Sequence, residues 1–182
     1  MNTPDLWVFA YGSLMWSPGF THLEARSALL RGYHRAMCIL STHYRGCHAA
    51  PGLVLGLDRG GSCRGRAFRV DAAASAAVIA YLHEREMLTN AYDPRYLPVH
   101  LDDGRRVKAY GFVVRHDHPQ YCGRLTPEES ARLIRQGHGS RGPCRDYLAN
   151  TIRHLEELGI REGPLHRLLA LVDQGEGGGG HA

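Results

Sequence analysis

The chain has 182 residues, of which 43% are hydrophobic and 22% charged, a balance that argues against collagen-like, disordered and disulfide-scaffold proteins. A chain of this length suits one domain with a core of its own. The formal net charge is +4, and because the arginines are scattered along the chain we expect no nucleic-acid partner.

The sequence shows no sign of a membrane segment or an export signal. No apolar run approaches the ~20 residues that a spanning helix needs. Residues 1–5 lack the basic n-region and the apolar h-region of a secretory signal. We therefore expect a cytoplasmic protein with no membrane partner.

Short apolar, β-prone segments separated by turns fill most of the first two thirds of the chain. The first, Leu6 to Tyr11, suits a strand buried on both faces, and Gly12 with Ser13 then breaks it. The further predicted strands are Ala36 to Ser41, Leu53 to Leu57, Gly65 to Val70, Tyr96 to Leu101 and Val107 to Arg115. The predicted turns are Ala50-Pro51-Gly52, Arg59-Gly60-Gly61 and the hairpin signal Asp102-Asp103-Gly104.

Helices are predicted once within this β region and then through the C-terminal third. The first opens after Asp71 as N-cap and runs to about Met87. Thr126-Pro127-Glu128-Glu129 combines a cap, a proline at the first helical position and a capping-box glutamate, and Gly137 ends that helix. Helical periodicity continues from Tyr147 to Leu158, and a last helix spans about Pro164 to Val172.

These elements predict one α+β domain over residues 1–173. No internal repeat and no linker interrupts it. Residues 174–182 are rich in glycine, and such a segment cannot repay its ordering entropy, so we expect a disordered tail there.

The sequence gives no reason to expect a metal or a cofactor. His116-Asp117-His118 lacks a third ligand at a convincing spacing, and the segment starting at His83 has Met87 where an HExxH helix needs histidine. Neither a P-loop nor a dinucleotide fingerprint is present. The cysteines are odd in number and lack CxxC spacing, which favours reduced thiols: Cys38, Cys47, Cys63, Cys122 and Cys144. Cys47 and Cys144 are conceivable nucleophiles, although a small buried thiol is the commoner role.

Glu86 is the most informative candidate for chemistry. On a helix it lies four residues after Leu82 and seven after Ile79, which places it on the apolar face. Glu84 is rotated away by about 200°. Burial and the helix C-terminus both raise the pKa of Glu86, which makes it a candidate general base. The alternatives are that Glu86 pairs with a nearby arginine or that the helix frays before reaching it.

The loop Tyr11-Gly12-Ser13-Leu14 is the second candidate. A buried strand that runs into a tight loop leaves backbone N–H groups available, and glycine lets a ligand approach the main chain closely. Such donors can hold a carboxylate or an oxyanion. The alternative is an ordinary turn, because Gly-Ser at a strand end is common there.

Together these segments resemble the ChaC family of γ-glutamylcyclotransferases. The opening Val8-Phe9-Ala10-Tyr11-Gly12-Ser13-Leu14-Met15-Trp16 is similar to the start of that family, and Tyr81-Leu82-His83-Glu84-Arg85-Glu86 is similar to its YLxxRE signature. The resemblance covers about residues 6 to 170. Its other matching positions are Gly32-Tyr33, Ser41, Arg45-Gly46, Pro51-Gly52, Gly65, Phe68, Gly142, Asp146-Tyr147-Leu148 and Leu158-Gly159-Ile160.

The resemblance implies a small mixed β-barrel flanked by helices, the γ-glutamylcyclotransferase-like fold. It also implies a lyase activity, the cleavage of glutathione to 5-oxoproline and cysteinylglycine without metal or cofactor. Glu86 is then the catalytic acid-base, and a small-molecule γ-glutamyl compound is the partner. The implied substrate-binding residues are Val8, Phe9, Ala10, Tyr11, Gly12, Ser13, Leu14, Arg45 and Tyr92.

Five positions depart from the family pattern and leave the substrate open. Ala10 stands where glycine is common, Asn90-Ala91 precedes Tyr92 where Gly-Gly is frequent, Cys47 replaces a threonine and Cys144 an asparagine. Other γ-glutamyl amides or dipeptides are therefore an alternative substrate class. A barrel that binds a ligand without catalysis is the alternative from a different class of protein.

Overall fold

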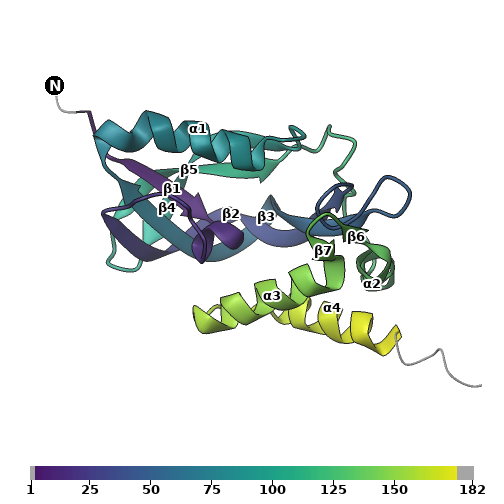
Figure 1. Cartoon of the computed structure of the whole chain (residues 1–182). Helices are drawn as coiled ribbons and strands as arrows, with labels where there is room; N and C mark the ends of the chain where they lie inside the picture. The colour runs from purple at the N-terminus through teal and green to yellow at the C-terminus, as the bar shows by residue number, and fades with distance from the viewer. Residues whose placement is uncertain (1–2, 176–182) are drawn as a thin grey trace, which may run out of the picture. The chain divides into compact units, whose positions relative to one another are not determined.

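The structure is a computed structural model that describes residues 3–175, so most of the predicted tail lies outside the described residues. Close contacts divide the chain into two compact units. Unit 1 takes its described residues from Met1–Ala36 and Gly56–His118, and unit 2 from Met37–Leu55 and Pro119–Ala182. Figure 1 shows the elements along the chain.

Unit 1 is built on a closed barrel with the strand order β1-β3-β2-β4-β5. Strand β1 pairs antiparallel with β3 and parallel with β5, which makes the barrel mixed as expected. The Asp102-Asp103-Gly104 hairpin is confirmed as the connection from β4 to β5. The strands are β1 (Leu6–Ala10), β2 (Glu24–Ser41), β3 (Gly52–Val70), β4 (Tyr92–Leu101) and β5 (Arg106–Val114).

Two strands are much longer than the sequence predicts. The predicted turn at Arg59-Gly60-Gly61 is wrong, because β3 runs through it and joins the two predicted strands into one. Gly60 and Gly61 have φ of 100° and 69°, so the glycines bend the strand without ending it. β2 likewise begins at Glu24, twelve positions before the predicted start at Ala36, with a polar and partly exposed first half.

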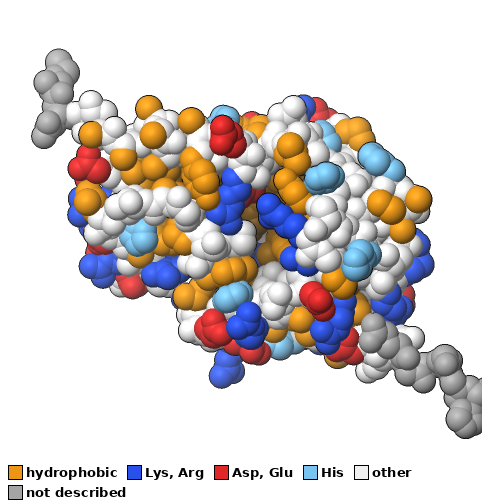
Figure 2. Space-filling view, viewed as in Figure 1, with side chains coloured by type: hydrophobic (Ala, Val, Ile, Leu, Met, Phe, Trp, Pro, Cys, Tyr) orange, Lys and Arg blue, Asp and Glu red, His pale blue; other side chains and the backbone are white. Residues whose placement is uncertain are grey.

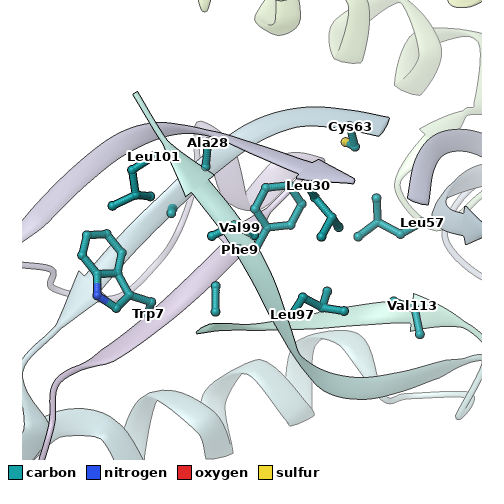
Figure 3. Packing of buried hydrophobic residues seen from close by; sticks show 12 residues of the cluster. Trp7, Phe9, Ala28, Leu30, Leu57, Cys63, Leu97, Val99, Leu101 and Val113 are labelled. Carbon is teal, nitrogen blue, oxygen red and sulfur yellow. The ribbon is translucent and has the colours of Figure 1, made fainter. Parts of the chain in front are cut away.

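The barrel interior is the hydrophobic core of unit 1. Figure 3 shows side chains of this cluster, among them Phe9, Leu30 and Val99, and every barrel strand contributes to it. All residues of β1 are buried, as the uninterrupted apolar sequence predicts. The cluster consists of Trp7, Phe9, Ala28, Leu30, Leu57, Cys63, Ala67, Leu97, Val99, Leu101, Ala109 and Val113.

Helix α1 (Ser75–Glu86) packs against the outside of the barrel in unit 1. Asp71 caps the short 3-10 helix η2 (Ala72–Ala74) that leads into it, since its side chain accepts the Ala73 N–H. Leu82 is fully buried, and His83 forms a 2.6 Å hydrogen bond to the Tyr110 hydroxyl on β5. The sequence therefore places this helix correctly, including its C-terminal end.

The described part of unit 2 contains three helices that contact one another: α2 (Pro127–Gln136), α3 (Cys144–Glu157) and α4 (Gly163–Gln174). The capping box of Thr126 and Glu129 is confirmed, as is the end of α2 at Gly137. A two-stranded ladder of β6 (His138–Gly139) and β7 (Gly142–Pro143) joins α2 to α3. Helix α4 continues two residues past the predicted end at Val172.

The described surface is mixed in charge. Figure 2 shows Lys and Arg side chains at several separate places on the face in view, with Asp and Glu among them. Among residues 3–175, no helix is long and apolar enough to cross a membrane. Across the same range, no three His, Cys, Asp or Glu side chains gather closely enough to hold a metal ion. His116 instead pairs with Asp58 at 2.6 Å.

Candidate active site

The loop that follows β1 is positioned by the close pairing of β1 with β3. Ala10 lies opposite Arg66 in the ladder, next to Gly65. A Cβ at Gly65 would lie 2.3 Å from the Ala10 carbonyl oxygen, so only glycine permits this approach. The end of β1 is thereby fixed where the chain leaves the sheet.

After Ala10 the chain turns into the short 3-10 helix η1 (Ser13–Met15). The Met15 N–H donates to the Gly12 carbonyl at 2.9 Å, which closes the turn. Gly12 and Ser13 begin this turn, where backbone N–H groups have no carbonyl of the same turn to bond. These N–H groups lie where the sequence predicts donors, and their use by a ligand stays a prediction.

Arg35 lies beneath this loop, and the sequence gives no hint of its role. Its side chain is buried in unit 1, with the residue only 6% exposed. Nε donates to the Tyr11 carbonyl at 2.6 Å, and Nη2 donates to the Arg64 carbonyl at 2.7 Å. A buried guanidinium thus fixes the Tyr11–Gly12 peptide and adds positive charge beside the loop.

Glu86 is the last residue of α1, on the half-buried side of the helix. Its side chain is 21% exposed, whereas Glu84 is exposed, as the helical rotation predicts. Burial raises the pKa of Glu86, and the neighbouring Arg85 guanidinium lowers it less. The predicted direction of the pKa is confirmed, and the helix does not fray before Glu86.

Arg85 connects the carboxylate to the loop. Its Nη2 donates to Ser13 Oγ at 2.8 Å, and its Nη1 donates to the Ser17 carbonyl at 2.7 Å. Nη1 also donates to the Tyr81 hydroxyl at 3.0 Å, which fixes the guanidinium against its own helix. Arg85 Nε lies 3.7 Å from Glu86 Oε1, too far for a hydrogen bond but within ion-pair distance, so the alternative that Glu86 pairs with a nearby arginine is confirmed.

The predicted site residues around the loop differ in what they can present to a ligand. Val8, Phe9 and Ala10 are at most 1% exposed, so their side chains belong to the core. Leu14 is also buried. Tyr11 and Gly12 are partly buried, and Ser13 is exposed. The loop thus offers a ligand backbone groups, the Tyr11 side chain and the Ser13 hydroxyl.

Tyr92 and Arg45 occupy different parts of the chain. Tyr92 is partly buried at the start of β4, opposite Val114, in the same unit as Glu86. Arg45 belongs to unit 2, where Nη1 donates to the Pro143 carbonyl at 3.2 Å and the guanidinium stacks on Tyr147, 5.7 Å from the ring centroid. The structure therefore brings Glu86 and the Tyr11–Ser13 loop together through Arg85, and assigns Arg45 contacts within unit 2.

The two candidate cysteine nucleophiles have opposite environments. Cys144 is fully buried, its Sγ lies 3.0 Å from the Leu53 carbonyl, and burial raises the pKa of its thiol. A buried thiol of raised pKa is a poor nucleophile, so Cys144 is a packing residue. Cys47 is exposed, contrary to the expectation of a buried thiol.

The fold is that of the γ-glutamyl cyclotransferases. A yeast γ-glutamyl cyclotransferase specific to glutathione superposes with a TM-score of 0.85 at 22% identity, covering 94% of this chain and 97% of that one. Residues 6–175 also match the sequence model described as ChaC-like protein. The chain belongs to the ChaC-like family.

Two curated relatives match nearly the whole chain. The glutathione-specific γ-glutamylcyclotransferase of Escherichia coli strain K12 is 36% identical over 167 residues, which cover 92% of this chain and 72% of the relative. The human glutathione-specific γ-glutamylcyclotransferase 1 is 31% identical over 172 residues, which cover 92% of this chain and 77% of the human protein.

Proposed function

We propose that this protein is a glutathione-specific γ-glutamylcyclotransferase, a lyase that converts glutathione to 5-oxoproline and cysteinylglycine. The observation that carries the proposal is Glu86, a half-buried carboxylate of raised pKa that Arg85 joins to an N–H-bearing loop. The names of the bacterial and human relatives support glutathione as the substrate. A small γ-glutamyl molecule is the expected partner.

The reaction needs no nucleophile from the protein. The α-amine of a γ-glutamyl group reaches its own γ-carbonyl carbon, forms a C–N bond and closes a five-membered ring. The amide C–N bond to cysteine then breaks, and cysteinylglycine leaves as the amine. The enzyme must hold the chain in its folded conformation and manage the protons.

Glu86 performs the proton transfers in this proposal. Of the three hydrogens on the substrate's α-ammonium, one stays on the ring nitrogen and two end on the departing amine. A carboxylate accepts a proton from the first nitrogen, donates it to the second and returns unchanged. The raised pKa of Glu86 brings the proton affinity of its carboxylate closer to that of the substrate's amine. The protonated carboxyl group is therefore a better intermediate in the proton transfer.

The Tyr11–Ser13 loop holds the charged parts of the substrate. Backbone N–H groups at Gly12 and Ser13 donate to the glutamyl α-carboxylate or to the oxyanion that develops on the γ-carbonyl. Arg35 donates to the Tyr11 carbonyl, which polarises the same peptide unit that carries the Gly12 N–H. Tyr92, in the same unit as Glu86, completes the proposed substrate contacts of that unit, whereas Arg45 of unit 2 stays a prediction from the sequence. The cytoplasm is the proposed compartment.

The test is 5-oxoproline release from glutathione by the purified protein, with γ-glutamyl-alanine in parallel. Glu86→Gln keeps the size and removes the titratable group, and we expect it to lose at least about 100-fold in kcat, the usual contribution of general acid-base catalysis. Glu84→Gln is the matched control on the exposed side of the same helix, and we expect it to retain activity.

Each outcome has a definite meaning. Release from glutathione that Glu86→Gln abolishes supports both the reaction and its acid-base residue. Release from γ-glutamyl-alanine alone keeps the mechanism and changes the substrate class. Absence of release from both substrates favours a barrel that binds without catalysis, and equal losses from both glutamine variants would contradict the role of Glu86.

A further inference from the structure

In unit 2, the end of β2 and the segment before α2 run antiparallel to each other. Ile39 and Tyr121 form a β-bridge, and the Leu40 N–H donates to the Gln120 carbonyl at 2.7 Å. On the other side of the bridge, the Cys122 N–H donates to the Cys38 carbonyl at 3.0 Å. This pattern places Cys38 directly opposite Cys122.

Residues directly opposite in an antiparallel pair project their side chains from the same face. The hydrogen bonds flank the bridge, so Cys38 and Cys122 occupy a hydrogen-bonded pair of positions, for which the Cα separation is about 5.5 Å. That separation lies within the range of about 4.4–6.8 Å in which disulfides form. The Cys122 Sγ already lies 3.0 Å from the Cys38 carbonyl oxygen.

From this register we propose that Cys38 and Cys122 form a reversible disulfide, a site of oxidation by small-molecule disulfides. Both cysteines are thiols in the structure. The pair lies wholly within unit 2, whereas Glu86 belongs to unit 1, and no step of the proposal uses Glu86 or the proposed reaction.

The unequal exposure of the two thiols sets the order of the steps. Cys122 is partly exposed and Cys38 only 2% exposed, so Cys122 meets the oxidant first. Its thiolate attacks a small disulfide, forms a mixed disulfide and releases one small thiol. The Cys38 thiolate then attacks the Cys122 sulfur and releases the second small thiol. Two protein thiols are oxidised and one small disulfide is reduced to two thiols, which carry away the two protons of the cysteines.

The position of the pair makes the bond easy to reduce. Cβ atoms of hydrogen-bonded pairs are about 5.5 Å apart, whereas those of a disulfide average about 3.8 Å. The bond therefore draws the two segments together under strain, and strained disulfides have more oxidising potentials. Three residues after Cys38, Ser41 Oγ accepts the Arg45 N–H at 3.0 Å, so this strain acts close to the loop that carries Arg45.

The experiment treats the reduced full-length protein with hydroxyethyl disulfide, which lacks a γ-glutamyl group and cannot act as a substrate. Remaining thiols are alkylated, and the protein is digested with trypsin without reduction. Trypsin places each cysteine on a different peptide, with Cys38 on residues 36–45 and Cys122 on residues 116–124. We expect these two peptides to be linked, with a mass two hydrogens below their sum, and to separate on dithiothreitol treatment.

Cys122→Ser should abolish the link, and Cys47→Ser, which removes the exposed thiol, should retain it. Cys38→Ser should abolish the link as well. Thermal unfolding of each variant checks that it folds, and if Cys38→Ser does not fold, Cys122→Ser alone tests the proposal. A link between other peptides, a mixed disulfide on Cys47 as the sole product, or a link that resists dithiothreitol would overturn the proposal.

Discussion

Replacing Arg85 with methionine should shift the pH dependence of the reaction. Only the deprotonated form of Glu86 can accept the substrate's proton, so activity rises with pH as this carboxyl ionises. Burial raises the pKa of Glu86 and the Arg85 charge lowers it. Removing that charge therefore raises the pKa further and moves the acidic limb of the profile to higher pH.

The geometry gives the size of this shift. Arg85 Nε and Glu86 Oε1 are 3.7 Å apart, with side chains 24% and 21% exposed. At about this distance two unit charges interact by about 1 kcal/mol in bulk water and about 4 kcal/mol at an effective dielectric constant of 20. Since one pKa unit corresponds to about 1.36 kcal/mol, the limb should move by roughly one to three pH units.

The assay is kcat/KM for 5-oxoproline release measured across pH. Arg85→Lys is the matched control, because it keeps the charge and loses the bidentate geometry that holds Ser13 and Ser17. We expect a raised KM in both variants and a displaced acidic limb only in Arg85→Met. An unchanged limb in Arg85→Met would refute either the electrostatic coupling or the role of Glu86 as base.

Two further predictions concern stability. Hydrogen bonds from arginines lower the pKa of Glu24 from its ordinary value of 4.5 to about 2. The contribution of Glu24 to the stability of the folded protein is therefore complete above pH 4.5 and is lost as the pH falls toward 2. The difference in free energy of unfolding between wild type and Glu24→Gln, measured in urea, should therefore shrink with acidification; a constant difference would contradict this. Leu82→Ala, at a fully buried position of α1, should lower the free energy of unfolding by about 2–5 kcal/mol in the same assay. Ala80→Ser, at an exposed position of the same helix, should change it by no more than about 0.5 kcal/mol. Equal effects of the two substitutions would refute the packing of α1.

The sequence alone determined the features that depend on near neighbours. Asp71 and Thr126 bond to backbone groups two and three residues away, and the Asp102-Asp103-Gly104 hairpin closes over a few positions. Helical rotation likewise separates Glu84 from Glu86. Such features are fixed by backbone geometry and local hydrogen bonds, so they can be predicted without knowing what lies opposite.

The tertiary structure decided every feature that depends on residues far apart in the chain. At Gly60 and Gly61 the sequence predicts a turn, but the structure has a bend within β3. A bend keeps the hydrogen bonds between the barrel strands, whereas a turn would end the strand. Arg85 bonds to Ser13 across 72 positions, and Cys122 lies opposite Cys38 across 84. No local signal encodes such pairs, since only closure of the barrel and packing of unit 2 bring these segments together.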